Sequence, residues 1–209
     1  MPLLYQQNID EYTRLAVWKI EEDEDFFLKK VPVKREISHL QKRLQHIAGR
    51  YLLSYLFPCF PAHEIKIAAT EKPYLPNEIY HFSISHCSNM AAAIVSKNKQ
   101  VGIDIERFTD KVFKVQHKFL NEKELTMLEN ISDENEKRKL LTTLWCTKET
   151  VYKWQGLEEV DFKKNILITP FSFSTMGSYH ARFSKEKNIA DLEIHYRLFD
   201  DFCLSWTCL

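Results

Sequence analysis

The sequence contains few glycines. Only four occur among its 209 residues, at Gly49, Gly102, Gly156 and Gly177, where average usage of about 7% would give roughly fifteen. The G-x-G-x-x-G dinucleotide fingerprint and the G-x-x-x-x-G-K-[ST] phosphate loop both need clustered glycines, for a tight turn and for close backbone approach to phosphate. Both are therefore excluded, and a phosphate ligand would have to be held by side chains or by a metal ion.

Net charge is also missing. Lysine plus arginine number 29 and aspartate plus glutamate number 29, so the formal net charge is zero. No global field then favours nucleic acid or an anionic membrane. We therefore expect neither as a partner, and any polyanion must be bound by a local group of basic side chains.

Signals for secretion, disulfides and zinc are absent as well. The five cysteines include no C-x-x-C pair, and the eight histidines include no H-x-x-x-H or H-E-x-x-H pattern. The first residues show no basic segment followed by an apolar one, and no apolar run approaches the roughly 18 residues that cross a bilayer. We expect a cytoplasmic protein with reduced cysteines.

The length allows one large domain or two small ones, and no linker-like composition marks a boundary. Residues 38–57 are the clearest predicted helix, with Leu40, Leu44, Ile47, Tyr51 and Tyr55 as its apolar stripe. Strands are predicted at 15–20, 65–69, 82–85, 90–96, 101–106, 192–199 and 202–208, and helical structure from 111 to about 154 with breaks near 121 and 132–133. This irregular alternation favours an α+β fold over a doubly wound sheet.

The segment 101–106, Val-Gly-Ile-Asp-Ile-Glu, alternates apolar and polar residues. On a strand, Ile103 and Ile105 would face a core, while Asp104 and Glu106 would project from the other face, about 6.5 to 7 Å apart. Mg²⁺ often takes one or two carboxylates together with water and substrate phosphate. Two solvated acids on an exposed strand give the same pattern, so the segment alone does not establish a metal site.

A second candidate segment is the predicted helix 144–153. Trp145, Glu149 and Lys153 recur there at four-residue steps, which places an acid and a base on one helix face. An ordinary solvated Glu–Lys pair has the same spacing and contributes little to stability.

The third segment is a strand that ends in Ser85-His86-Cys87-Ser88. Hydroxyls, an imidazole and backbone donors at a strand end can hold a phosphate without glycine. A Cys–His protease dyad is disfavoured, because adjacent strand residues point to opposite faces. His86 as a structural histidine remains an alternative.

Taken in order, five motifs resemble the 4′-phosphopantetheinyl transferase superfamily, in its longer, monomeric, surfactin-synthetase-activating type. They are Lys72-Pro73, Phe-Ser-Ile-Ser-His at 82–86, Val-Gly-Ile-Asp-Ile-Glu at 101–106, Phe-Leu-Asn-Glu-Lys-Glu at 119–124 and Trp-Cys-Thr-Lys-Glu-Thr-Val-Tyr-Lys at 145–153. The resemblance implies two similar α+β halves in a pseudo-twofold arrangement, 1–100 and 101–209. It also implies that coenzyme A binds in the cleft between them and that the second half carries most of the metal site.

Carried over position by position, the resemblance implies Mg²⁺ ligands at Asp104, Glu106 and Glu149. Glu149, Lys153 and Asp104 would be the catalytic residues. The residues implied to bind coenzyme A are Arg43 or Arg50 for the 3′-phosphate, Lys72 and Pro73 for the adenine, Ser85 and His86 for phosphates, and Lys153 with Lys148 for the diphosphate.

The reaction implied is attack by a serine hydroxyl of an apo carrier protein (acyl, peptidyl or similar) on the pantetheine-side phosphorus of coenzyme A, with release of 3′,5′-ADP. Glu149, a metal-bound water or Glu124 could take the serine proton. A Mg²⁺-dependent phosphohydrolase is an alternative, although such enzymes often use two metal ions and the sequence has no second acidic cluster near Asp104 and Glu106. A non-catalytic coenzyme A scaffold is another, although it would not need Glu149 and Lys153 together.

A basic stripe is predicted on the helix that follows the 101–106 strand. Lys111, Lys114 and Lys118 recur there at spacings of three and four. Such a stripe could orient an acidic carrier protein, or it could be the solvated face of an amphipathic helix. The doubled length implied by the resemblance predicts a monomer.

Overall fold

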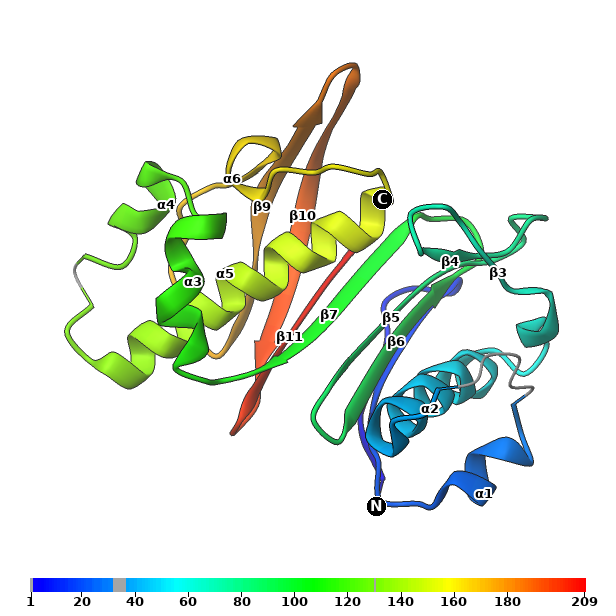
Figure 1. Cartoon of the computed structure of the whole chain (residues 1–209). Coiled ribbons are helices and arrows are strands. Elements are labelled where there is room, and N and C mark those ends of the chain that lie inside the picture. The colour runs from blue at the N-terminus through cyan, green and yellow to red at the C-terminus, as the bar shows by residue number, and fades with distance from the viewer. Residues whose placement is uncertain (1, 32–36, 130) are drawn as a thin grey trace.

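The computed structural model describes residues 2–31, 37–129 and 131–209, and its mixed helices and sheets confirm the expected α+β class (Figure 1). The strands are β1 (Leu3–Asn8), β2 (Thr13–Lys19), β3 (Lys66–Ile67), β4 (Pro73–Tyr74), β5 (His81–Cys87), β6 (Met90–Ser96), β7 (Val101–Arg107), β8 (Ile166–Ile168), β9 (Met176–Lys185), β10 (Asn188–Leu198) and β11 (Phe202–Cys208). The helices are α1 (Glu24–Leu28), α2 (Leu40–Leu56), the 3₁₀ turn η1 (Ala62–Glu64), α3 (Lys111–Phe119), α4 (Glu122–Thr126), α5 (Glu134–Gln155) and α6 (Phe162–Asn165).

The first sheet is antiparallel, with strand order β1-β2-β6-β5. Helix α2 covers one of its faces, as Figure 1 shows. The predicted apolar stripe of this helix is partly wrong, because Leu40 is 56% exposed and Tyr55 is 36% exposed. The buried side is centred on Ala48 and Leu52. This side faces the sheet, and Gly49 lets the helix approach it closely. A Cβ at position 49 would lie only 2.5 Å from Cγ2 of Ile84, so no larger residue fits there without a shift.

The second sheet has the order β7-β11-β10-β9-β8, and α5 packs across it. Three elements here and in the first sheet carry no clear sequence signal. Strand β1 is half-buried on alternate residues, β8 has only three residues, and β9 has several exposed positions. They form because they extend existing sheets, which is a tertiary effect that strand propensity does not reveal.

The two sheets share a core between their inner faces. Leu15, Val17 and Ile94 from the first sheet meet Ile103 and Ile105 from the second. The predicted alternation of the 101–106 strand is thereby confirmed. Asp104 lies on the opposite face of β7, the face covered by α5.

Side chains, not a backbone ladder, join β5 to β7 along the seam between the sheets. The hydroxyls of Ser83 and Ser85 accept hydrogen bonds from the backbone N–H groups of Ile103 and Ile105, at 3.2 and 3.3 Å. The strands are not paired in the sheet topology. The seam brings the end of β5 next to Asp104.

Among the helices of the described residues, none is long and apolar enough to span a membrane.

Candidate active site

A carboxylate, a lysine and a serine from three different elements meet at the seam. Lys153 Nζ on α5 donates to Asp104 Oδ1 on β7 at 2.5 Å and to Ser85 Oγ on β5 at 2.9 Å. Ser85 Oγ in turn donates to Asp104 Oδ1 at 2.7 Å. The structure therefore brings together three of the predicted site residues. Ser85 lies 19 positions from Asp104 in the chain, and Lys153 lies 49 positions from it.

Helix α5 reaches this position because Gly102 leaves room for it. A Cβ on Gly102 would overlap the carbonyl oxygen of Thr150 and lie 2.9 Å from Trp154 Cβ. The last turns of α5 therefore rest directly on the strand that carries Asp104. This close approach aims Glu149 and Lys153 toward β7.

The cluster carries more negative than positive charge. Burial, together with the charge of Asp104, raises the pKa of Glu106 and of Glu149 to about 7 in each case. Burial lowers the pKa of Lys153, but the Asp104 and Glu149 carboxylates outweigh that effect, so its pKa is raised. One lysine thus faces three acidic side chains.

Asp104 has an oxygen without a partner. Its side chain is 2% exposed, and Oδ2 is buried with no hydrogen-bond partner within the described part of the chain. Such an orphaned carboxylate oxygen is costly unless something else binds it. Glu106 is held nearby by the indole Nε1 of Trp145, which donates to its Oε1 at 3.2 Å.

The donor set fits a hard divalent cation, but the side chains do not enclose one. Across residues 2–31, 37–129 and 131–209, no group of three or more His, Cys, Asp or Glu side chains is arranged to hold a metal ion. Mg²⁺ commonly takes only one or two protein carboxylates and completes its shell with water and substrate phosphate. Asp104 with its free oxygen, Glu106 and Glu149 are chemically suited to that incomplete kind of site.

A cavity of about 300 Å³ opens beside Lys153, between residues 70–73, β5 and the end of α5. Its walls include Lys72 and Pro73 from the segment before β5, Ser83 on β5, and Tyr152 and Lys153 on α5. Burial lowers the pKa of Lys72 to about 8. Lys72 and Pro73 therefore line the same cavity as Lys153. Ser83 and Tyr152 are additional wall residues that were not among the predicted site residues.

Other residues of the predicted coenzyme A set lie outside that cluster. Arg43 on α2 donates to Glu24 Oε2 at 2.6 Å and to the carbonyl of Ile37 at 3.2 Å. Arg50 forms no hydrogen bond or ion pair among the residues described, and burial lowers its pKa. His86 is exposed at the end of β5, and desolvation of its ring and the charge of Lys153 lower its pKa.

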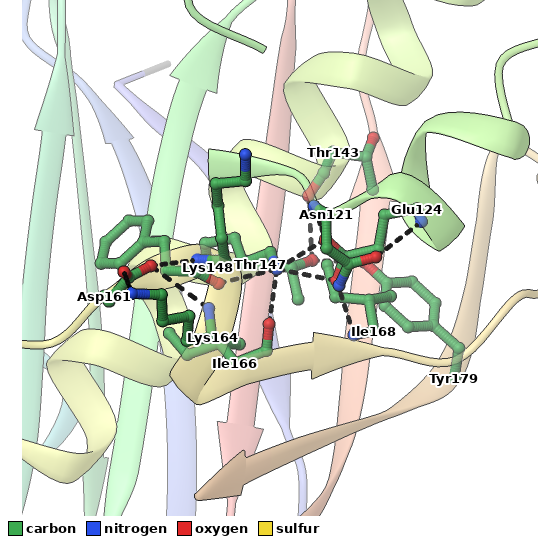
Figure 2. A network of polar contacts seen from close by, with 12 residues as sticks. Asn121, Glu124, Thr143, Thr147, Lys148, Asp161, Lys164, Ile166, Ile168 and Tyr179 are labelled. Carbon is green, nitrogen blue, oxygen red and sulfur yellow. Dashed lines mark hydrogen bonds and ion pairs between the residues drawn. The ribbon is translucent and has the colours of Figure 1, made fainter. Parts of the chain in front are cut away.

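The structure contradicts the prediction that Lys148 binds the diphosphate. Its side chain is fully buried, and Nζ donates to both oxygens of Glu124, at 2.7 and 2.8 Å. It also donates to the carbonyl of Phe162 at 3.0 Å and to that of Ile166 at 2.5 Å; Figure 2 shows Lys148 between Glu124 and Ile166. With all its hydrogens engaged, Lys148 has no donor left for a ligand.

Glu124 is equally occupied. Besides Lys148, it accepts the backbone N–H of Ile168 at 2.8 Å and that of Asn121 at 3.0 Å (Figure 2). A general base must reach a substrate proton, and this carboxylate is only 1% exposed. The alternative of Glu124 as the base is therefore wrong.

The predicted basic stripe is accessible. Lys111, Lys114 and Lys118 are all exposed on α3. Lys118 also lines an open groove of about 700 Å³, whose apolar wall includes Phe119 and Trp145. This groove leads toward the cluster through Trp145, which contacts Glu106.

Comparison with known proteins connects this arrangement to one family. Residues 100–207, just over half of the chain, match the family model described as the 4′-phosphopantetheinyl transferase superfamily. The matched region contains β7, α5 and every carboxylate of the cluster.

Three curated relatives agree with that match. The 4′-phosphopantetheinyl transferase gsp of Aneurinibacillus migulanus is 31% identical over 137 residues, which is 65% of this chain and 55% of the relative. The 4′-phosphopantetheinyl transferase HetI of a Nostoc species is 32% identical over 96 residues, 43% of this chain and 38% of the relative. Enterobactin synthase component D of Escherichia coli is 38% identical over 81 residues, 36% of this chain and 34% of the relative. The aligned segments thus span between a third and just over half of the relatives' own lengths.

Proposed function

The chain belongs to the 4′-phosphopantetheinyl transferase superfamily, and from this premise we propose that it transfers the 4′-phosphopantetheine arm of coenzyme A to a serine of an apo carrier protein. The observation that carries the proposal is the cluster of Asp104, Ser85 and Lys153 beside the cavity between β5 and the end of α5. A diphosphate ligand placed there would meet a lysine, a hydroxyl and a carboxylate with one free oxygen.

The protein's own groups suit a displacement at phosphorus, in which positioning and charge neutralisation dominate. Lys153 would bind the diphosphate, because its raised pKa keeps it protonated. The Ser85 hydroxyl, which donates to Asp104 Oδ1 in this structure, would turn its hydrogen to a phosphate oxygen of the same group. Mg²⁺ held by Asp104, Glu106 and Glu149 would supply further charge neutralisation when bound.

Glu149 is the residue we assign to proton removal from the carrier serine. Its pKa, raised by burial and by Asp104 to about 7, suits a base that works near neutral pH. Glu124 no longer competes for this role, because it is buried against Lys148.

The coenzyme A adenine is assigned to the cavity wall formed by Lys72 and Pro73. The 3′-phosphate is assigned to Arg50 in preference to Arg43, because Arg43 is already paired with Glu24. His86 is assigned to a phosphate oxygen at the open end of β5. We also propose that the protein acts as a monomer, because segments far apart in this chain, at Lys72 and at Lys153, together line the cavity.

The carrier protein is proposed to be acidic and to dock on Lys111, Lys114 and Lys118, which are exposed on α3. Lys118 lines the groove that also includes Trp145. A cytoplasmic location is proposed because the cysteines are all free, as expected in a reducing compartment.

One assay tests the function. The purified protein is incubated with coenzyme A, Mg²⁺ and an apo carrier protein, and the carrier is examined by intact mass spectrometry. Gain of the phosphopantetheine mass, with release of 3′,5′-ADP, is the expected result. Coenzyme A hydrolysis without transfer would show a phosphohydrolase, and binding without turnover would show a scaffold; either result would contradict the proposal.

A further inference from the structure

The carbonyl oxygen of Trp154 accepts two hydrogen bonds from side chains outside its own helix. Lys72 Nζ donates at 2.8 Å, and Gln100 Nε2 donates at 2.5 Å. Helix α5 ends at Gln155, and Gly156 closes it in the left-handed conformation with φ of 69°. The Trp154 carbonyl is therefore one of the last four, which have no partner within a helix. An ammonium group at this end is also favoured by the helix dipole.

The two donors are themselves held in place. Gln100 directly precedes β7, and its backbone N–H and C=O pair with the C=O and N–H of Leu209, at 2.9 and 3.0 Å. Lys72 comes from the segment before β4, and its stem packs over Gly156, where a Cβ would lie 2.7 Å from Lys72 Cδ. The end of α5 is thus held by two separate segments, the one that precedes β4 and the one that joins β6 to β7.

This grip acts on the turn that carries Lys153. Trp154 follows Lys153 directly, so the position of its carbonyl fixes how that last turn is rotated about the helix axis. Gly102 allows the same turn to rest on β7, two residues before Asp104. With the turn fixed in this rotation, Lys153 donates to both Asp104 and Ser85.

We propose that Gln100 and Lys72 form a clasp on the Trp154 carbonyl that holds Lys153 in its working orientation, which makes Gln100 a positioning residue for the transfer reaction. This inference rests on the proposed function. It also assigns the Lys72 ammonium to the helix end, so that Lys72 contributes its stem to the cavity wall and does not bind phosphate.

Gln100→Leu is the direct test. Gln100 is exposed, so its replacement leaves the cores intact. Loss of the donor should raise amide hydrogen exchange in residues 150–158 by about tenfold, since the last turn of α5 would open more often. It should lower kcat by about tenfold while KM for coenzyme A changes by less than about twofold, because a misdirected Lys153 weakens the transition state more than the ground state.

Gln116→Leu is the matched control. It removes another glutamine amide that donates to a single backbone carbonyl, that of Phe113, at 3.0 Å. Exchange in residues 150–158 and kcat should both stay at the wild-type values.

The partner donor is tested by Lys72→Met combined with Gln100→Leu. Because both groups act on one oxygen, the double variant should lose less kcat than the product of the two single losses. Unchanged exchange in residues 150–158 for Gln100→Leu would overturn the clasp. Faster exchange with unchanged kcat would overturn its role in positioning Lys153. A wild-type protein without transferase activity would refute the proposed function, while the exchange comparison would still decide whether the clasp exists.

Discussion

Helix α5 carries two lysines, five residues apart, that each pair with an acid in a different environment. Lys148 and Glu124 are almost wholly buried, and every hydrogen-bonding atom of the pair has a protein partner. Lys153 is 27% exposed and pairs with Asp104, whose Oδ2 has no partner among the described residues. The first pair is complete without a ligand, and the second is not.

Whether every polar atom of the pair has a partner distinguishes a structural ion pair from a binding one more clearly than the types of the residues do. Both pairs consist of a lysine and a carboxylate joined at 2.5 to 2.7 Å. Glu124–Lys148 ties α4, α5 and β8 together and has no capacity left. Asp104–Lys153 faces a cavity and is surrounded by Glu106 and Glu149, whose pKa values are raised by burial and by Asp104. Unsatisfied charge beside open space is what indicates the ligand site.

The largest effect should come from the incomplete pair. Asp104→Asn keeps the side-chain shape but removes the charge that orients Lys153 and suits a cation. We expect transfer to fall about a thousandfold, while the melting temperature stays within about 2 °C of wild type because repulsion from Glu106 and Glu149 is relieved. Steady-state kinetics and thermal melting measure the two outcomes.

The control for this variant is Asp191→Asn, at an exposed position paired with Arg182, which should leave activity unchanged. If Asp104→Asn lowered the melting temperature so far that the protein was unfolded under assay conditions, the Asp104–Lys153 pair would be structural as well. The proposed difference between the two pairs would then be wrong.

The complete pair should respond in the opposite way. Glu124→Gln leaves the ammonium of Lys148 buried without its countercharge, so the free energy of unfolding should fall by about 3 to 5 kcal/mol. Urea denaturation measures it. Adding Lys148→Met should recover part of that loss, since the uncompensated charge disappears. A double variant no more stable than Glu124→Gln would show that the charge is not the cause.

Binding of Mg²⁺ should depend on pH through Glu106 and Glu149. Their pKa values are raised from 4.5 to about 7 in the folded protein, so between these values the unfolded chain holds fewer protons and stability falls as pH rises. Above about pH 7 both carboxylates are ionised and can bind a cation without releasing protons. Millimolar Mg²⁺ should therefore raise the melting temperature by about 2 to 4 °C at about pH 8 and by less at about pH 6.

The matched sample is Asp104→Asn, in which the Mg²⁺ shift should be smaller at both pH values. An equal shift in wild type at both pH values would place the cation elsewhere.

The smallest effect concerns the surface stripe. Lys111→Glu combined with Lys114→Glu should raise KM for the carrier protein about fivefold, because each exposed ion pair contributes only tenths of a kcal/mol to about 1 kcal/mol. KM for coenzyme A should not change. Steady-state kinetics with each substrate varied in turn separates the two constants.

The charge-matched control is Lys66→Glu with Lys187→Glu, two exposed lysines on other elements. If it raised KM for the carrier equally, the effect would come from net charge and not from a docking site on α3.

Local patterns in the sequence predicted much of the site. The bounds of β6 follow from a short, continuous apolar run that is buried throughout. The alternation that separates Ile103 from Asp104 follows from period-two patterning. The four-residue steps place Glu149 and Lys153 on one face of α5, and the structure directs both toward Asp104. Each of these predictions depends on neighbours within one element.

What the sequence could not reveal depends on partners from distant elements. The family resemblance implies that Lys148 binds the diphosphate together with Lys153. However, Lys148 is rotated about 100° around the helix from Glu149 and meets Glu124, 24 positions away. Gln100 carries no motif at all, and its role follows only from the end of α5 lying beside it. Ser83 could have been recognised, since it shares a strand face with Ser85.

The serine bridge between β5 and β7 has a consequence for how the molecule unfolds. The outer edge of β7 has its Ile103 and Ile105 amides bonded only to hydroxyls from the other sheet. If the first sheet unfolded alone, the amides of Ile103 and Ile105 would lose their hydroxyl acceptors. They would then either stay buried without an acceptor or become exposed to water together with the apolar core that the two sheets share. Neither sheet can therefore keep its edge intact alone, and the chain should lose its structure in one cooperative transition, with no stable half-folded species.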